Sequence, residues 1–324
     1  MLAVWGVKMS KLTVITATYN RSKLLPRAIE SVLNQSFEDF EYVIINNGST
    51  DDTQDVIDSY MSQDRRIRCI KNDKNSLSGQ SNEQRKLNIE TKENKFCTWV
   101  DDDDWIHNNM LDTLYHMAID TGSDICSVGS EYVFPDGKKK DKYVFAGQYT
   151  FNRIDAMIEL LKREKINSAS GGKLYRKKLH HNLDLPEVPR IRDIHVQYRV
   201  MNRINQMTIS GEPMYYFYRH DGNVSGLNTK DQITPELLRE HLYANHLRTD
   251  YLKSRMPEIE DFVLYSEYSF MLSLTDRIHS LSVVDCYEIA EEMKKRLIDV
   301  NKWLFGSGYL NSKEEKNLLS YVYG

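Results

Sequence analysis

The chain has 324 residues and a mass of 38.0 kDa, which is long enough to bury a full hydrophobic core in one large domain with an appendage. Its formal net charge of −4 and pI near 6.2 give no overall attraction to nucleic acid or anionic lipid, which argues against a dedicated DNA-binding protein. The four cysteines are scattered without the spacing of a zinc site, so we expect reduced, buried thiols in a cytoplasmic protein.

The first residues of the chain are apolar, but they are too few to span a bilayer. They also lack the basic flank and cleavage site of a secretory signal, so we expect residues 1–10 to form an N-terminal extension. No later apolar run has the length of a membrane helix. The sequence therefore predicts a soluble protein that is cytoplasmic, or at most peripheral at the inner face of the membrane.

Strand and helix patterns alternate over the first third of the chain. Runs of β-branched and apolar residues predict buried strands over residues 11–18, 41–47, 67–71 and 96–100. Apolar residues at helical spacing predict helices over residues 24–33, 52–61, 80–91 and 108–121. This alternation predicts an α/β fold of the Rossmann-like type, in which helices flank both faces of a mostly parallel sheet.

The pattern changes twice in the later part of the chain. Residues 123–217 mix strand and helix signals, and a hairpin is expected over residues 130–148, so the sheet should gain antiparallel strands. From Thr234, a helix cap, and Pro235, in the first turn, three amphipathic helices are expected to the end. We therefore expect a main α/β domain over residues 11–228 and a helical C-terminal region over residues 229–324. This region could support the α/β domain, form a homo-oligomer or bind a substrate.

Polar clusters follow three of the predicted strands: Thr18-Tyr19-Asn20, residues 46–49, and residues 101–104. In open α/β sheets ligands bind beyond the carboxyl ends of the strands. The four aspartates at residues 101–104, here called the aspartate cluster, repel one another, and Mg²⁺ or Mn²⁺ bound together with substrate phosphates would neutralise them. A solvated acidic turn, or a cap of the next helix by Asp104, is the alternative interpretation.

Four segments together resemble the family-2 glycosyltransferases of the GT-A fold. They read ITATYNRSKLLPRAIESVLNQSF at residues 15–37, INNGSTDDT at 45–53, WVDDDD at 99–104 and YFYRHDGNVSG at 216–226. The resemblance covers roughly residues 11 to 227, and the joint spacing is more specific than any single motif. It implies an inverting transferase that moves a sugar from a nucleotide sugar to the hydroxyl of a glycan, a lipid-linked sugar, a protein or another compound.

The resemblance also implies roles for individual residues. Asp101 and Asp103 match the family's Asp-x-Asp pair, and with His220 they would hold Mn²⁺ or Mg²⁺. The nucleotide-sugar site would be lined by Thr18, Tyr19, Asn20, Asn47, Arg85, Asp101, Asp102 and Gly172. Plainer interpretations stay open for three of these residues. Arg85 could be a helix-surface charge, His220 could be structural, and Gly172 could belong to an ordinary tight turn.

Asp193 is the candidate general base, because the family carries an acidic pair before a helix and this chain keeps only the second acid, after Arg192. Asp193 could instead cap that helix. A second departure is the presence of Asn46 and Asn47 where the family usually has aspartates. An amide side chain both donates and accepts hydrogen bonds, so the contact with the nucleotide base could differ, and UDP is the favoured nucleotide.

Two other functions are compatible with parts of this pattern. A sugar-phosphate nucleotidyltransferase also uses a nucleotide-binding sheet and Mg²⁺, but it typically has a Gly-rich loop after the first strand, and Thr18-Tyr19-Asn20-Arg21 contains no glycine. A non-catalytic carbohydrate- or metal-binding protein could keep the aspartate cluster without turnover. Incubation of the donor with Mn²⁺ would leave the nucleotide sugar intact in that case.

Overall fold

The computed structural model describes residues 10–73, 95–186, 191–220, 227 and 229–323. The chain folds as two compact units, of which the first comprises Met1–Ala156 and Arg163–His220 and the second Met157–Lys162 and Asp221–Gly324. The expected boundary after residue 228 stays a prediction, because residues 221–226 and 228 lie outside the described chain. Among the described residues, no helix combines the length and the apolar character needed to cross a lipid bilayer.

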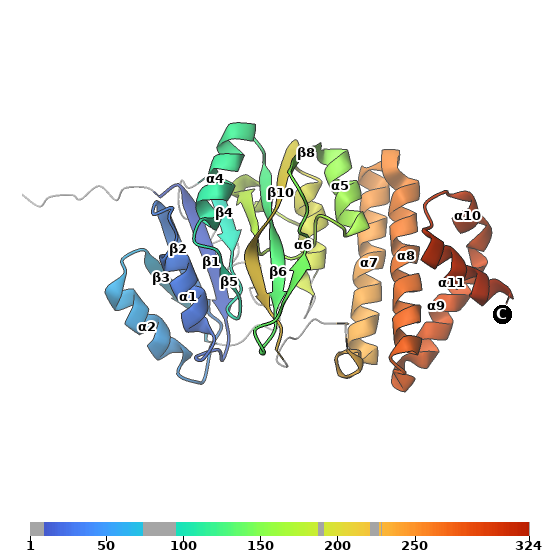
Figure 1. Cartoon of the computed structure of the whole chain (residues 1–324), viewed down its shortest axis with the longest axis horizontal. Coiled ribbons are helices and arrows are strands. Elements are labelled where there is room, and N and C mark those ends of the chain that lie inside the picture. Colours follow the sequence, from blue (N-terminus) through green and yellow to red (C-terminus); the bar gives the residue numbers. More distant parts are fainter. Residues whose placement is uncertain (1–9, 74–94, 187–190, 221–226, 228, 324) are drawn as a thin grey trace, which may run out of the picture. The chain divides into compact units, whose positions relative to one another are not determined.

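The first unit is built on one ten-stranded sheet with the order β3-β2-β1-β4-β9-β6-β10-β5, to which β7 and β8 pair from the side (Figure 1). Its parallel part consists of β1 (Leu12–Thr18), β2 (Phe40–Asn46), β3 (Ile67–Lys71) and β4 (Phe96–Trp99). These four strands agree with the predicted ones to within one residue at each end. The run of apolar and β-branched residues predicted them correctly because β1 and β2 are buried almost throughout.

Antiparallel strands extend the sheet, as expected for residues 123–217. They are β5 (Trp105–Ile106), β6 (Ile125–Val133), β7 (Lys139–Lys142), β8 (Gln148–Asn152), β9 (Lys173–Arg176) and β10 (Gln206–Tyr218). The predicted hairpin is present, since β6 and β7 pair antiparallel. One pair departs from this pattern, because β10 runs parallel to β6.

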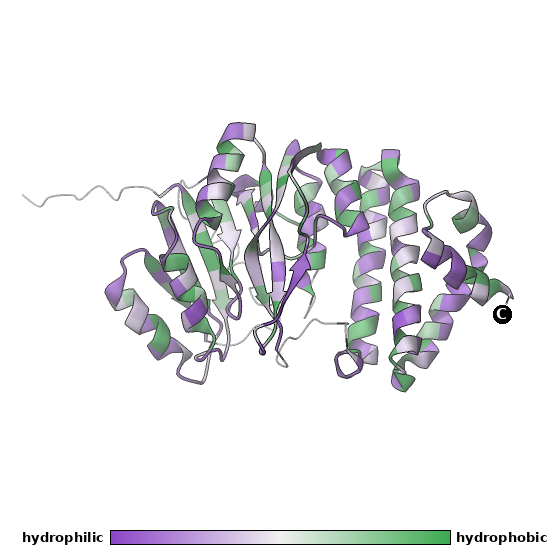
Figure 2. Ribbon diagram, in the orientation of Figure 1, coloured by the Kyte–Doolittle hydropathy of each residue, from purple (hydrophilic) through white to green (hydrophobic). Residues whose placement is uncertain are grey.

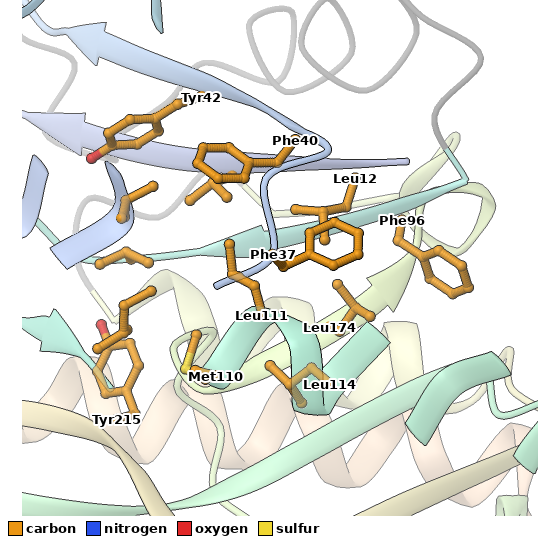
Figure 3. Packing of buried hydrophobic residues seen from close by; sticks show 14 of the residues in the cluster. Leu12, Phe37, Phe40, Tyr42, Phe96, Met110, Leu111, Leu114, Leu174 and Tyr215 are labelled. Atoms are coloured by element: carbon orange, nitrogen blue, oxygen red, sulfur yellow. The ribbon is translucent and has the colours of Figure 1, made fainter. Parts of the chain in front are cut away.

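Helices of the first unit connect and cover these strands. They are α1 (Leu25–Leu33), α2 (Thr53–Gln63), α4 (Met110–Thr121), α6 (Arg192–Met201) and the start of α5 (Arg153–Lys162), with a short 3-10 helix η1 (Lys177–His180) after β9. The predicted helix over residues 80–91 lies outside the described residues. A hydrophobic core packs α1 and α4 against β1, β2 and β4 through residues such as Leu12, Phe40 and Leu111 (Figure 3). This core holds the carboxyl ends of the parallel strands in place.

The second unit is helical, with α7 (Pro235–Arg255), α8 (Glu260–Ser280), α9 (Tyr287–Asp299), α10 (Asn301–Gly306) and α11 (Ser312–Tyr323). Thr234 caps α7 as predicted, because its hydroxyl accepts the Leu237 N–H at 3.3 Å. The expected three helices correspond to α7, α8 and α9, and two further helices follow them. Hydrophobic and hydrophilic residues alternate around these helices (Figure 2), and the buried apolar residues include Leu238, Met271, Ile289 and Leu297.

Candidate active site

The ends of β1 and β2 are joined by a network of short hydrogen bonds. The Asn47 N–H donates to the Thr18 carbonyl at 2.9 Å, and the Asn20 side chain accepts the Thr50 N–H at 2.8 Å. Asn20 has a φ of 52°, a left-handed conformation that asparagine tolerates better than most residues. Thr18 is buried, whereas the Tyr19 side chain next to it is exposed. Three predicted donor-site residues therefore lie on one rigid turn beside Asn47.

The amides of Asn46 and Asn47 are used within the β2 turn. Asn46 donates to the Gln54 side chain at 2.8 Å and accepts the Ser49 N–H at 2.9 Å. The Asn47 side-chain oxygen accepts a hydrogen bond from Asn72 at 2.9 Å. A carboxylate at position 46 could only accept, so Gln54 would have to turn its amide and give up its hydrogen bond to Asp58.

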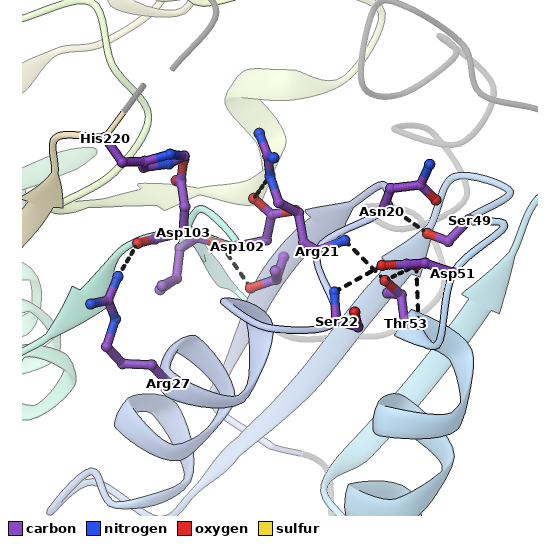
Figure 4. Close-up of polar contacts among 12 residues, drawn as sticks. Asn20, Arg21, Ser22, Arg27, Ser49, Asp51, Thr53, Asp102, Asp103 and His220 are labelled. Atoms are coloured by element: carbon purple, nitrogen blue, oxygen red, sulfur yellow. Dashed lines mark hydrogen bonds and ion pairs between the residues drawn. The ribbon is translucent and has the colours of Figure 1, made fainter. Parts of the chain in front are cut away.

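Beside this turn, the Asp51 carboxylate connects the ends of β1 and β2 a second time. It accepts the Ser22 N–H at 3.2 Å and the Thr53 N–H at 3.1 Å (Figure 4). Burial is the largest single effect and opposes the ionised form, but the hydrogen bonds from Thr53 and Ser22 together outweigh it and lower the pKa of Asp51 to about 2. The loops after β1 and β2 are thus held together by an ionised side chain at neutral pH.

The aspartate cluster follows β4 and lies next to the β1 turn. The Asp102 carboxylate is 3.9 Å from the Arg21 guanidinium. Burial and the Asp103 charge raise the pKa of Asp102 to about 6, although the Arg21 charge and the Tyr19 backbone partly oppose the rise. This contact joins the cluster to the ends of the first two strands, which is the arrangement that a nucleotide-sugar site at the strand ends requires.

Asp103 pairs with His220, since their Oδ2 and Nε2 atoms are 3.0 Å apart (Figure 4). His220 follows β10 and stacks on Tyr218, with 5.3 Å between the ring centroids. The Arg27 guanidinium lies over the rings of Trp105 and Tyr218, at 4.0 and 4.3 Å, and donates to the Asp103 carbonyl at 2.6 Å. Arg27 therefore holds the cluster and the end of β10 together.

Asp104 does not cap the next helix, contrary to the alternative considered from the sequence. Its carboxylate accepts the Tyr218 N–H at 2.8 Å, and α4 begins only at Met110, after the short strand β5. The side chain is buried, and burial together with the Asp103 charge raises its pKa well above the ordinary range. Asp104 thus connects the cluster to β10.

Asp193 faces the cluster from the first turn of α6. Its carboxylate accepts a hydrogen bond from the Ser170 hydroxyl at 2.9 Å. The pKa of Asp101 is raised well above its usual range, first by burial and then by the charges of Asp104 and Asp193. Asp101 lies among protein atoms but keeps solvent-exposed surface, through which a ligand can reach it. The candidate base and the cluster therefore belong to one electrostatic site.

Gly171 and Gly172 make room for the ring of Tyr215. A Cβ atom on Gly171 would lie 2.4 Å from the Tyr215 ring, and one on Gly172, where φ is 71°, would lie 3.2 Å from its Cβ. The Tyr215 hydroxyl in turn accepts the Asp101 N–H at 3.1 Å. The predicted approach of Gly172 to the sugar stays a prediction, and the described contact of this glycine pair is with Tyr215.

The structure brings together the predicted residues Thr18, Tyr19, Asn20, Asn47, Asp101, Asp102, Asp103, Asp193 and His220 at adjoining strand and helix ends. Arg85 lies outside the described residues. Sequence reasoning missed Arg27, Ser170 and Tyr215. The one signal available in the sequence was for Arg27, a basic residue on an apolar helix face. Ser170 and Tyr215 have partners far away in the sequence.

The donor atoms of the site fit a divalent cation. Asp101, Asp102 and Asp104 all have pKa values raised by burial and by neighbouring carboxylates, so a positive charge would relieve an existing repulsion. Carboxylate oxygen is the ligand that Mg²⁺ and Mn²⁺ prefer. In the described part of the chain, no three His, Cys, Asp or Glu side chains converge on one point. A cation here would therefore need oxygen ligands from a substrate as well.

Comparison with known proteins places the chain in a family. Residues 13–183, more than half of the chain, match the model of glycosyl transferase family 2. Glycosyltransferase GlyG of Streptococcus pneumoniae is 24% identical over 225 residues, which cover 67% of this chain and 73% of GlyG.

Two solved structures have a similar fold. S. aureus TarS 1-349 in complex with UDP-GlcNAc aligns with a TM-score of 0.65 at 18% identity, over 96% of this chain and 90% of that one. The mannosyltransferase PcManGT from Pyrobaculum calidifontis, in complex with GDP-Man and Mn2+, aligns with a TM-score of 0.54 at 12% identity, over 96% of this chain and 84% of that one. The chain belongs to glycosyl transferase family 2, and it is a glycosyltransferase with the GT-A fold that its motifs predicted.

Proposed function

We propose that the protein transfers a sugar from a UDP-sugar to an acceptor hydroxyl with inversion, using Asp193 as the general base and Mn²⁺ or Mg²⁺ at the aspartate cluster. The observation that carries this proposal is the Asp103–His220 pair at 3.0 Å, and the charge of Asp193, which raises the pKa of Asp101, supports it. The carboxylate proposed as the base and the side chains proposed as cation ligands would then share one site, although α6, β4 and β10 are distant in sequence.

The donor would bind at the ends of β1, β2 and β4. Thr18, Tyr19, Asn20 and Asn47 line the first two ends, and Asp102 would face the diphosphate next to them. The TarS complex with UDP-GlcNAc supports UDP as the nucleotide. PcManGT has GDP-Man bound at a lower structural similarity, so GDP is the competing nucleotide in the experiment below.

Asp103 and its partner His220 would hold the cation first, and Asp101 would have to move toward it when the donor diphosphate supplies further oxygen ligands. The PcManGT complex with Mn2+ supports this assignment. When bound, a divalent cation stabilises the negative charge that develops on a departing diphosphate. The raised pKa values of Asp101 and Asp104 are consistent with this use, because ionised carboxylates there need a positive partner.

Asp193 would take the proton of the acceptor hydroxyl while its oxygen forms a bond to the anomeric carbon and the bond from that carbon to the diphosphate breaks. Attack from the face opposite the leaving group inverts the configuration. The hydrogen bond from Ser170 orients one carboxylate oxygen of Asp193 and leaves the other available for the proton. The acceptor would be a hydroxyl of a glycan, a lipid-linked sugar, a protein or a related compound.

The metal and donor assignments can be tested by thermal unfolding with UDP, UDP-GlcNAc and GDP, each with and without Mn²⁺. A ligand at a hundred times its Kd stabilises the folded state by about 2.7 kcal/mol. We expect UDP ligands to raise the unfolding temperature only with Mn²⁺, and Asp103→Ala to abolish this shift. Asp112→Ala, an exposed position on α4, is the matched control and should keep the shift. A full shift without metal, or with Asp103→Ala, would falsify the metal assignment.

The base can be tested with Asp193→Asn, which keeps the size of the side chain and can still accept the Ser170 hydrogen bond. We expect nucleotide release from UDP-GlcNAc to slow by roughly 10²–10⁴-fold, the usual contribution of a general base. The Mn²⁺-dependent UDP thermal shift should remain, because the donor site is intact. Turnover by Asp193→Asn within about threefold of the unsubstituted protein would rule out this residue as the base.

A further inference from the structure

Lys173, the first residue of β9, has a buried ammonium group that no step of the proposed reaction uses. The residue is 1% exposed, and its Nζ donates to the Asn167 side-chain oxygen and to the Ala169 carbonyl, both at 2.5 Å. Burial lowers the pKa of Lys173 to about 7, against the attraction of the Asp193 charge. Lys173 thus ties down the segment that precedes it and lies within the field of Asp193.

That segment, residues 167–172, is the one that contacts Asp193. Ser170 lies next to the carbonyl that Lys173 holds, and its hydroxyl donates to the Asp193 carboxylate at 2.9 Å. Beyond Ser170, Gly171 and Gly172 pack against Tyr215. The segment is therefore fixed on both sides of Ser170, by an ammonium group on one side and by an aromatic ring on the other.

A role in stability alone does not explain a lysine at this position. Removing an ammonium group from water is costly, and buried charges are often replaced by apolar side chains without loss of stability. The backbone of Lys173 is already anchored, because the buried Thr98 hydroxyl donates to its carbonyl at 2.7 Å. The ammonium group adds contacts only to Asn167 and Ala169 among the hydrogen bonds of the described residues.

We propose that Lys173 is a positioning residue, whose two hydrogen bonds hold residues 167–170 so that Ser170 keeps the Asp193 carboxylate in place. The part of this proposal that concerns catalysis rests on the proposed role of Asp193 as the base. The part that concerns the local structure does not, and the two can therefore be tested separately.

Hydrogen–deuterium exchange on the full chain tests the local structure. Lys173→Met, which keeps an unbranched chain without the charge, should speed up exchange in peptides covering residues 166–172 and also in those covering the start of α6 at residues 191–196. Ser170→Ala should speed up exchange at residues 191–196 alone, and this variant keeps the test decisive if Lys173→Met folds poorly.

Thr98→Val is the matched control, because it removes a buried hydrogen bond to the Lys173 carbonyl and leaves the ammonium group intact. We expect it to lower the unfolding temperature without faster exchange at residues 191–196. The proposal is overturned if Lys173→Met leaves residues 191–196 unchanged, or if Thr98→Val produces the same exchange pattern.

Kinetics with UDP-GlcNAc then test the catalytic consequence. Misplacing a reacting group by about 1 Å can cost about 100-fold in rate, so we expect Lys173→Met to lower kcat by roughly 10- to 100-fold with little change in KM for the donor. In a Ser170→Ala background the same substitution should cost much less, because the connection to Asp193 is already broken. Additive losses would contradict the proposal. If Asp193→Asn were fully active, the proposed base would be wrong, and the exchange experiment would still decide the role of Lys173.

Discussion

At the scale of single residues, the environment of Asp102 in the site disfavours the ionised form of its carboxylate. Asp102 lies between Asp103 and the β1 turn, and burial followed by the Asp103 charge raises its pKa from 3.8 to about 6. The charged form of Asp102 is therefore less stable in the folded protein than in the unfolded chain. Such a group is expected where a cation binds, because binding rather than folding compensates the charge.

Asp102→Asn should accordingly stabilise the protein at pH 7.5 in the absence of divalent cations, by on the order of 2 kcal/mol. Between pH 4 and 6 the folded state of the unsubstituted protein binds more protons at Asp102 than the unfolded state does. The contribution of Asp102 to the free energy of unfolding therefore falls as the pH rises. The advantage of Asp102→Asn should thus be small near pH 4 and complete above pH 6. Urea unfolding of both proteins in EDTA at several pH values measures this difference in the free energy of unfolding.

Asp112→Asn, at an exposed position on α4, serves as the control and should show no such pH-dependent gain. A lower stability of Asp102→Asn than of the unsubstituted protein at pH 7.5 would contradict the electrostatic description of the cluster.

The candidate residues were predictable where a local motif carried them. The aspartate cluster and the Thr18 turn each follow a buried strand, and that context is visible within a few residues. Arg27 and Tyr215 were not predictable in this way, because their partners Asp103 and Asp101 are 76 and 114 residues distant. Hydrogen bonds over such separations depend on the strand order, which the sequence pattern does not specify.

At the scale of elements, one helix residue connects two strand ends. Arg27 of α1 contacts Trp105 of β5 and Tyr218 of β10 and also bonds the Asp103 carbonyl. Through these contacts it supports the pairing of Asp103 with His220. A helix that was expected only to cover the sheet therefore also helps to position the aspartate cluster.

Arg27→Met should weaken Mn²⁺-dependent binding of UDP about tenfold, because a charge-assisted hydrogen bond contributes roughly 1.5–3 kcal/mol and part of this loss falls on the geometry of Asp103. Isothermal titration calorimetry measures the change. Arg66→Met is the matched control, since Arg66 also lies over an aromatic ring, Phe40 at 4.6 Å, and donates to a backbone carbonyl, Leu33 at 3.0 Å. Equal losses of UDP affinity in the two variants would show that Arg27 has no specific role.

Elements were predicted well where burial is uniform along a segment and less well where it is not. The strands β1, β2 and β4 are buried almost throughout, and their bounds were correct to within one residue. The bounds of β3 were also correct, although only its first residue is buried. The break between α9 and α10 at Val300 was not predicted, because the apolar positions continue through it. The interpretation of Asp104 as a helix cap was wrong because β5, a strand of two residues, separates it from α4.

At the scale of the whole molecule, buried polar contacts join the helices of the second unit. In the helical unit, Arg248 of α7 donates to Ser266 of α8 at 2.9 Å, and Glu267 accepts from Arg296 of α9 at 3.2 Å. Polar contacts of this kind can specify how helices pair. The expected roles of this unit in oligomerisation or acceptor binding stay predictions, since a helical appendage alone does not define a function.

The α/β class of the first unit and the glycosyltransferase family both followed from the sequence, because the motifs recur at strand ends with a consistent spacing. Membership of this family displaces the two alternatives, a nucleotidyltransferase and a non-catalytic binding protein. The pairing of β10 with β6 in parallel could not be predicted, since both strands are joined through a long connection that the local pattern does not constrain.

The contact between Gly171 and Tyr215 restricts how this protein can evolve. An alanine at position 171 would overlap the Tyr215 ring at 2.4 Å, so it becomes tolerable only after the ring has been replaced by something smaller. That replacement would remove the hydroxyl that accepts the Asp101 N–H. A descendant that has lost Gly171 should therefore also have lost Tyr215, whereas a descendant that has lost Tyr215 can still keep the glycine.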